Sequence, residues 1–396
     1  MIYLDNNATT KVDEKVLEKM LPYFQDEYAN PSSMYNFAKK SSDAIKESRG
    51  IIKDFLGANS EKAIIFTSCG SESANTAING VLKCAKEKRH IITTKVEHPC
   101  VLNTYKSLEK QGYEVDYISV DSEGILNIDE LKDKLRKDTA LVSVMWANNE
   151  NGVINPVEEI ADIIKSRSPE TIFFVDAVQA AGKIPINVKD TQIDLLGISG
   201  HKFHAPKGIG ALYIKPSARI TPLICGGHQE RGLRAGTENV PYIAGMATAA
   251  KLAMNYLDYE VKEVKRLRDK LEEGILRTVF NSRLNSSASK RVPNTTNIGF
   301  EYVEGELILL HLNDLGICAS SGSACTSGSL EPSHVLKAMG IPFTALHGSI
   351  RFSLSRFNTE KEIDYVIEHM PAIMNKLTSI SPFQDEIEAI RRRKGF

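Results

Sequence analysis

The sequence predicts an α/β fold built on a parallel sheet and joined to a smaller unit of strands and helices. From about residue 60, short apolar runs alternate with amphipathic stretches, which is the pattern of parallel strands connected by helices. After residue 238 the pattern changes to a long charged helical stretch and then to strand, helix, strand and helix. We see neither internal repeats nor a linker long enough to separate the two units fully.

Six apolar runs of the first unit are predicted strands. Several are apolar throughout, as is typical of strands that are covered on both faces. The strands are expected at 63–69, 90–96, 113–120, 140–147, 171–178 and 193–199, and the helices between them at 101–112, 127–137 and 156–167.

The second unit begins with a long charged helix, expected over 255–280. A strand at 295–303, a helix at 305–316, a strand at 348–355 and a helix at 362–377 follow. One face of the last helix is apolar and predicts core packing instead of a cofactor contact. That face comprises Ile363, Val366, Ile367, Met370, Ile373, Met374 and Leu377.

Charge and cysteine content exclude several classes of protein. The 396 residues carry a formal net charge of −1, which gives no general attraction to nucleic acid or anionic membranes. The basic run at 391–396 predicts a solvated, disordered tail and not a binding patch. The start of the sequence does not resemble a signal peptide, and no apolar run is long enough to span a membrane. Six cysteines without a C-x-x-C pair predict no metal site and a reduced, cytoplasmic protein.

Polar residues follow several of the predicted strands, at the edge where open α/β sheets bind ligands. Gly70, Ser71 and Glu72 follow the first strand at the start of a helix, which suits either a phosphate or an ordinary helix cap. Asp176 follows an apolar strand and needs either a cationic partner or a structural role as a cap or ion pair.

Two lysines follow the strand at 193–199, in the run "ISGHKFHAPKGIG". Lys202 lies just after the apolar residues, with Ser199 and His201 beside it, where partial desolvation would make an amine nucleophilic. Lys207 lies in a predicted turn, and either lysine taken singly could be a surface residue. A phosphate cradle, a carboxylate and a lysine at strand ends together are what pyridoxal 5'-phosphate requires.

Cys325 lies in "ASSGSACTSGS", residues 319–329, among serine, glycine, alanine and threonine. Such a run predicts a mobile segment and not a packed core, so this cysteine is not expected to serve as a hydrophobic residue. The other five cysteines are expected to be structural or incidental. They are Cys69, Cys84, Cys100, Cys225 and Cys318.

Over nearly the whole chain the sequence resembles the cysteine desulfurases of the NifS/IscS type, a class-V aminotransferase-like group of fold-type-I pyridoxal-phosphate enzymes. The resemblance is carried by "YLDNNATT", "NPSS", "EHPCVLNT", "ANNENG", "VDAVQAAGKIP", "SGHKFHAPKGIGALY", "RGLRAGTENV", "SSGSACTSGSLEPSHVL" and "IRFSLSR". It implies a large cofactor-binding domain, 15–254, with a mixed, mostly parallel sheet flanked by helices. It also implies a small α+β domain, 1–14 and 255–396, that carries the cysteine segment.

The resemblance assigns roles to single residues. Lys202 matches the lysine that carries the cofactor, His98 the histidine that stacks on its ring, and Asp176 the partner of the ring nitrogen. Cys325 matches the catalytic cysteine that accepts sulfur. The other cofactor contacts fall on Gly70, Ser71, Asn149, Gln179, Ser199, His201 and Thr237.

Two of these positions imply partners. Thr237 matches a phosphate contact that the second subunit supplies, which implies a homodimer. Arg351, with Asn149 nearby, matches the arginine that holds the substrate carboxylate, and a bidentate guanidinium suits that group. Two positions depart from the family pattern. Tyr35 stands where a histidine is usual, and Ser71 stands where threonine is frequent but keeps the hydroxyl.

The implied reaction removes sulfur from L-cysteine, gives L-alanine and leaves a persulfide on Cys325. Lys202 would take the α-proton, and His98 would serve as acid or base for the thiol protons. The sulfur would pass to an acceptor protein, for iron–sulfur cluster assembly, a nitrogenase-type system or tRNA thiolation. The alternatives are a selenocysteine lyase or aminotransferase on the same fold, or a non-catalytic scaffold or metal-binding protein that uses "HKFH" and "HPC".

Overall fold

A computed structural model describes residues 1–321 and 332–395. Its largest element is a seven-stranded sheet with the order β2-β8-β7-β6-β5-β3-β4. Only β8 runs antiparallel to its neighbours, so the sheet is mixed and mostly parallel, as expected. The strands are β2 (Ile64–Thr67), β3 (His90–Thr94), β4 (Glu114–Ile118), β5 (Thr139–Met145), β6 (Ile172–Asp176), β7 (Leu195–Ser199) and β8 (Gly210–Ile214).

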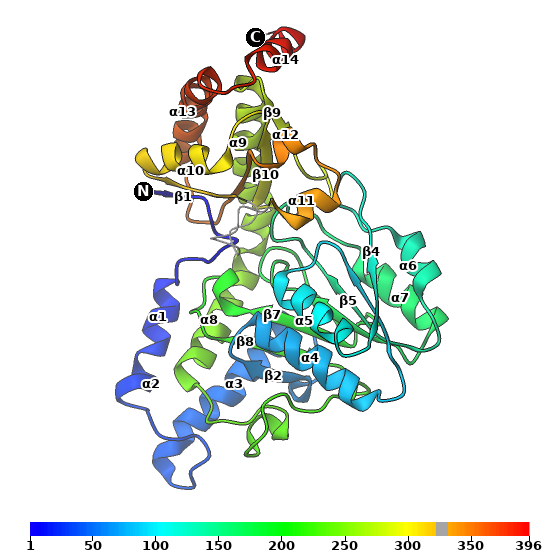
Figure 1. The fold of residues 1–396 in the computed structure, drawn as a ribbon. Helices are drawn as coiled ribbons and strands as arrows, with labels where there is room; N and C mark the ends of the chain where they lie inside the picture. The colour runs from blue at the N-terminus through cyan, green and yellow to red at the C-terminus, as the bar shows by residue number, and fades with distance from the viewer. Residues whose placement is uncertain (322–331, 396) are drawn as a thin grey trace.

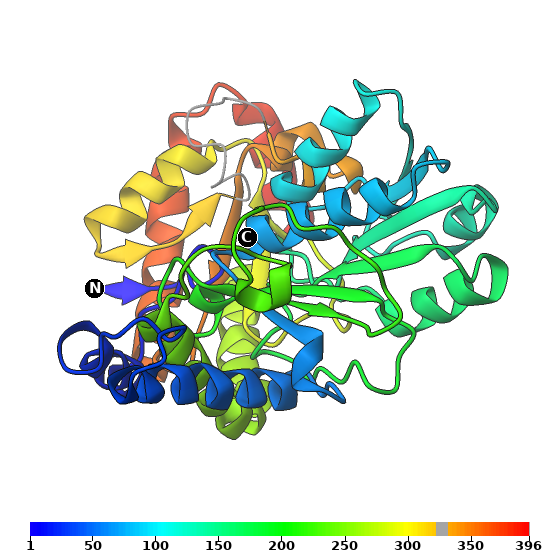
Figure 2. The ribbon, with the colours of Figure 1, turned by 90° about the horizontal axis from the view of Figure 1, so that it is seen from below.

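Helices cover both faces of this sheet (Figure 2). In β6, Phe173 packs into the hydrophobic core on one face of the sheet, and its neighbour Phe174 packs into the core on the other face. This two-sided burial explains why the strands are apolar throughout. One face carries α4 (Gly70–Cys84) and α5 (Pro99–Glu109), and the other carries α3 (Lys39–Phe55), α7 (Val157–Arg167) and α8 (Val240–Tyr259). Shorter helices of this unit are α1 (Glu14–Met20), α2 (Pro22–Gln25) and α6 (Ile128–Lys134).

The second unit lies above the large sheet in Figure 1 and has its own core. A four-stranded antiparallel sheet, β12-β13-β10-β9, is covered by three helices. The strands are β9 (Ser282–Leu284), β10 (Thr295–Phe300), β12 (Ser320–Ser321) and β13 (Ser349–Ser353). The helices are α9 (Lys265–Thr278), α10 (Gly305–Asp314) and α13 (Glu360–Ser379), with α11 (His334–Ala338) and α12 (Phe343–Leu346) beside them.

Two connections join the units. A π-helical stretch, Glu260–Val264, links α8 to α9, so the three form one continuous helical segment. The domain boundary expected after residue 254 falls inside α8, within this segment. The N-terminal strand β1 (Ile2–Tyr3) pairs with β11 (Ile317–Cys318) of the second unit, beside α10 in Figure 1. The chain then crosses to α1 in the first unit, and residues 5–10 lie between the two.

Most predicted elements are confirmed, and two differences have physical reasons. The strand β8 was not predicted, because it directly follows the turn at Lys207 and Gly208. The basic run is not a disordered tail: Arg391 to Lys394 form the last turn of α14 (Gln384–Lys394). Ile387 and Ile390 pack on Phe280, and cations at a helix C-terminus interact favourably with the helix dipole.

The apolar stripe of α13 packs into the core of the second unit, as predicted. Among the helices of the described ranges, none is both long and apolar enough to cross a membrane.

Candidate active site

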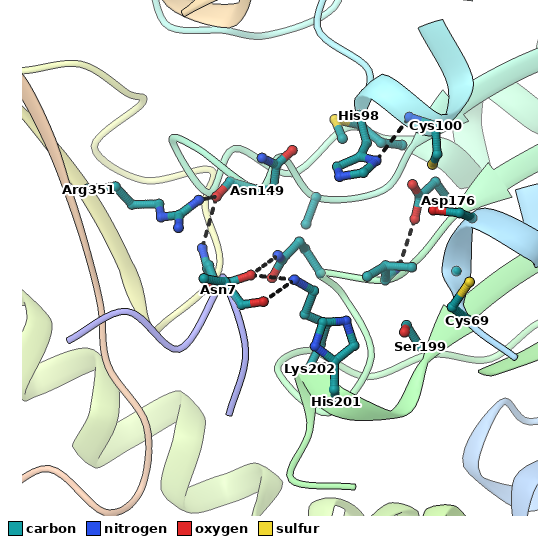
Figure 3. A pocket seen from close by; sticks show the side chains of 17 residues that line it. Asn7, Cys69, His98, Cys100, Asn149, Asp176, Ser199, His201, Lys202 and Arg351 are labelled. Carbon is teal, nitrogen blue, oxygen red and sulfur yellow. Dashed lines mark hydrogen bonds between the residues drawn. The ribbon is translucent and has the colours of Figure 1, made fainter. Parts of the chain in front are cut away.

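A cavity of about 370 Å³ lies at the carboxyl ends of β5, β6 and β7, between the two units. Figure 3 shows its side chains converging from the large sheet, from β13 and from the N-terminal segment. The lining comprises Asn7, Ala8, Cys69, Gly70, Ser71, His98, Cys100, Met145, Ala147, Asn149, Asp176, Val178, Gln179, Ser199, His201, Lys202 and Arg351. Every expected site residue within the described ranges is among them, except Thr237.

Lys202 enters the cavity from the single turn that follows β7. Its ammonium nitrogen donates to two backbone carbonyls, those of Asn7 at 2.6 Å and Ala8 at 2.8 Å. The side chain is therefore anchored at its tip by the N-terminal segment, and its amine reaches a space large enough for a small ligand (Figure 3).

Asp176 is the last residue of β6 and is 7% exposed. One carboxylate oxygen accepts a hydrogen bond from the Val178 N–H at 2.9 Å. Burial raises the pKa of Asp176 to about 6, and the nearby Lys202 partly opposes that rise. A buried carboxylate that faces a cavity is complementary to a cation bound there.

His98 is the N-cap of α5, and its Nδ1 accepts a hydrogen bond from the Cys100 N–H at 3.1 Å. Burial lowers the pKa of His98 to about 4, and the positive charge of Lys202 adds to the effect. The imidazole is therefore neutral near pH 7. Because Nδ1 is an acceptor, the proton lies on Nε2.

The N-terminus of α4 forms another wall of the cavity. Gly70 and Ser71 begin this 15-residue helix, whose first N–H groups have no partner within the helix. A Cβ at Gly70 would lie 2.8 Å from Val178 Cγ2, so only glycine allows this close approach. Ser199 and His201 line the cavity from the end of β7. Burial lowers the pKa of His201 to about 4, so it is a neutral group at an anion site.

Arg351 comes from β13 in the small unit and is 3% exposed. Its guanidinium donates to the Asn149 carbonyl at 2.9 Å and pairs with Asp5 at 2.7 Å. The third nitrogen, Nε, has no hydrogen-bond partner within the described part of the chain. The group is thus held rigidly at the cavity wall, and Asp5 already offsets part of its charge. The sequence analysis did not single out Asp5.

Two expected residues lie elsewhere. Thr237 is exposed and lines a different cavity, together with Glu230 and Arg234. Tyr35 is 57% exposed and is absent from the lining of the main cavity. Cys325 lies outside the described residues.

The five described cysteines are free. Two of them line the cavity, which the sequence did not indicate. The Cys69 sulfur caps α4 by accepting from the Glu72 N–H at 3.4 Å. Burial raises the pKa of Cys100, so this thiol stays protonated.

The N-terminal segment is the part of the site that sequence reasoning missed. Asn7 lines the cavity and contacts both units, because its side-chain amide donates to Thr295 Oγ1 at 2.8 Å and to the Asn149 carbonyl at 3.2 Å. The one available signal was the block "YLDNNATT", which belongs to the resemblance but was given no role.

Comparison with known proteins gives the family. The profile described as "Aminotransferase class-V" matches residues 2–366. The chain belongs to the class-V aminotransferase family. A protein named cysteine desulfurase from Nostoc sp. is 57% identical over 386 residues, which is 98% of this chain and 96% of that protein. Cysteine desulfurase NifS of Azotobacter vinelandii is 50% identical, over 96% of this chain and 94% of that protein. A solved structure titled "NIFS-LIKE PROTEIN" has a TM-score of 0.90 and 40% identity, covering 95% of this chain and all of that one.

Class-V enzymes of this type depend on pyridoxal 5'-phosphate, and the cavity fits that cofactor. Lys202 supplies the amine for covalent attachment, and the buried Asp176 supplies an anion for a protonated ring nitrogen. The α4 N-terminus, with its glycine at the closest approach, supplies N–H groups for a phosphate. The fold is that of the fold-type-I pyridoxal-phosphate enzymes.

Among the described residues, no group of three histidine, cysteine, aspartate or glutamate side chains is placed to hold a metal ion.

Proposed function

We propose that this chain is a cysteine desulfurase that uses the cavity around Lys202 to convert L-cysteine to L-alanine, with Cys325 as the sulfur acceptor. The observation that supports it most is the convergence of Lys202, Asp176, His98 and Arg351 on one cavity from separate elements. Bound pyridoxal phosphate supplies the chemistry of an electron sink next to the substrate α-carbon.

The residues of the chain divide the remaining work. Arg351 binds the substrate carboxylate and thereby orients the α-carbon, since its guanidinium is already fixed by Asp5 and Asn149. Lys202 takes the α-proton as general base and returns a proton to the α-carbon when alanine forms. His98 stays neutral, so it packs flat against a ring without adding a second positive charge beside Lys202.

The sulfur step balances without any external oxidant. The Cys325 thiolate attacks the substrate sulfur and forms an S–S bond. The bond between that sulfur and the substrate β-carbon breaks, and its electron pair stays with the β-carbon. That carbon gains a proton to become the methyl group of alanine. Cys325 ends as a persulfide. Of the two thiol protons of the reactants, one ends on the persulfide and the other in the new methyl group.

The cofactor site is tested by borohydride reduction of the purified holoenzyme and peptide mapping. We expect the pyridoxyl group on Lys202. Lys202→Ala should abolish alanine formation, whereas Lys207→Ala should keep it. Recovery of the label on Lys207, or alanine formation by Lys202→Ala, would contradict the proposal.

We further propose a homodimer that shares its phosphate sites. Thr237 is exposed and lies away from the cavity of its own subunit, as a residue that contributes to a partner's site would.

Free cysteines in the described part of the chain are compatible with a reducing, cytoplasmic location, and we propose that location. The persulfide would pass to an acceptor protein such as an iron–sulfur scaffold, and capture of the protein that reacts with labelled persulfide would identify it.

A further inference from the structure

Lys183 is a buried lysine next to the cavity to which neither the sequence analysis nor the proposed mechanism gives a role. It is 5% exposed and follows Gly182, whose φ of 76° turns the chain where a side chain would press on Phe203. Its nitrogen donates to Gln179 Oε1 and, at 2.9 Å, to Asn7 Oδ1. A lysine is rarely buried without a specific partner, so these two contacts require an explanation.

The contacts of Lys183 fix the orientation of the Gln179 amide. An ammonium only donates, so the Gln179 oxygen must face Lys183 and its NH2 must lie on the other side. There the NH2 donates to the Asn7 carbonyl at 3.0 Å, which is an acceptor and agrees with this orientation. Gln179 also lines the cavity, and within the described ranges one of its two N–H groups has no partner.

The same ammonium fixes Asn7. Asn7 Oδ1 accepts from Lys183 and from Asn294 Nδ2 at 3.2 Å, so its amide nitrogen is directed to Thr295 and Asn149. The backbone carbonyl of Asn7 then accepts from Lys202 at 2.6 Å. Lys183 therefore contacts Gln179 directly and is connected to Lys202 through Asn7, and both Gln179 and Lys202 line the cavity.

The surroundings of Lys183 are charged on several sides. Burial is the main reason why the pKa of Lys183 falls to about 7. The positive charges of Lys202 and Arg351 lower it further, whereas Glu260 raises it. Lys183, Lys202 and Glu260 also share a second, smaller cavity of about 20 Å³ behind Lys202.

We propose that Lys183 is a positioning residue: it holds the Gln179 amide with its NH2 toward the cavity and holds Asn7 with its carbonyl toward Lys202. The inference rests on the proposed function and deepens it. Gln179 presents a donor to the ring oxygen of the cofactor because Lys183 occupies its acceptor. When Lys183 is protonated, this donor stabilises the anionic form of that oxygen.

The test is a double-mutant cycle on the purified holoenzyme with Lys183→Met, Gln179→Ala and the double variant. The readouts are the pH midpoint of the visible absorption band of bound cofactor, and kcat and KM for L-cysteine. Each single variant is expected to raise the midpoint by about one unit, because the oxygen loses its donor. The double variant should shift no further than either single one. For Lys183→Met we expect kcat to fall about tenfold while KM changes less than about threefold.

Lys165→Met is the matched control, because Lys165 is a partly buried lysine of the large unit that pairs with Asp194 at 2.6 Å and does not line the cavity. It should leave the midpoint unchanged. Lys183→Gln is the second variant should Lys183→Met not fold, since a shorter neutral amide cannot reach both acceptors and should give the same shift. An unchanged midpoint in a folded Lys183 variant, or a double variant whose shift equals the sum of the singles, would overturn the inference. A wild-type protein without the absorption band or without alanine formation would overturn the proposed function itself.

Discussion

At the scale of single residues, the proposed nucleophile can be separated from the binding apparatus. Cys325→Ser should still bind the cofactor and L-cysteine, because every described residue of the cavity is unchanged. It should form less than about 1% of the alanine of the wild type, since serine is a far weaker nucleophile than a thiolate. The measurement is alanine formation beside the spectral change on adding L-cysteine, with Cys84→Ser, at an exposed cysteine, as control. Normal alanine formation by Cys325→Ser would exclude the role.

Glu97 allows a prediction on pH. It precedes His98, is fully buried, and its Oε1 accepts from Thr94 at 2.7 Å and from the Met145 N–H at 2.9 Å. Burial raises the pKa of Glu97 from 4.5 to about 8 in the folded protein. The folded state therefore holds a proton that the unfolded state releases near pH 4.5, so this group lowers stability as the pH rises from about 4.5 to about 8.

Glu97→Gln should remove that loss, because glutamine is neutral at every pH. The free energy of unfolding of the variant, relative to wild type, should rise by about 1 kcal/mol or more between pH 5 and pH 8, the equivalent of at least one pKa unit. Denaturant unfolding of the cofactor-free protein at several pH values measures it. A constant difference across this range would show that Glu97 does not titrate as described.

At the scale of elements, the start of α4 is the critical contact between a helix and the cofactor space. Gly70→Ala should push α4 away from Val178, because the new methyl group would lie 2.8 Å from a side-chain carbon. We expect cofactor affinity to fall about tenfold or more and the free energy of unfolding to fall by about 1–3 kcal/mol. Equilibrium dialysis and denaturant unfolding measure the two effects. Gly112→Ala is a poor control, because Gly112 has a φ of 88°; Ser107→Ala on the exposed face of α5 is a better one.

Elements were predictable from the sequence where burial imposes a pattern. Strands β2, β5, β6 and β7 are mostly apolar because helices cover both faces of the sheet. The apolar residues of α13 repeat at helical spacing because one face of that helix packs against the core of the second unit. The short strands β1 and β11 were not predicted, because each has two residues and no periodicity can be recognised in two residues. The site was predictable where reactive side chains lie at the ends of strands, as Asp176 and Lys202 do. Asn7 was not predictable, because its contacts with Lys183 and Lys202 join residues that are more than 170 positions apart, and the role of Lys183 depends in part on the same contact.

At the scale of the whole molecule, the proposed dimer makes a prediction of its own. If Thr237 serves the partner's phosphate site, a heterodimer of Lys202→Ala and Thr237→Val subunits contains one intact site, built from the second subunit's Lys202 and the first subunit's Thr237. Mixing the inactive Lys202→Ala variant with the impaired Thr237→Val variant after mild dissociation should restore up to about half of the wild-type activity per dimer, as the symmetry of a two-fold assembly requires. Sedimentation of the wild type should give twice the chain mass. An active monomer, or mixing without recovery, would contradict the shared site.

The position of the N-terminal segment has a consequence for how the protein is made. Asn6 donates to the Ser353 carbonyl, 347 residues further along the chain, and Asn7 contacts Thr295 and Ser353. A ribosome adds about 5–20 residues per second, so Asn6 waits roughly 20–70 s for Ser353 to be synthesised. The large sheet, whose strands end at residue 214, can assemble during that interval. The contacts of Asn6 and Asn7 with the second unit, which close the cavity around Lys202, therefore form after the large sheet can assemble.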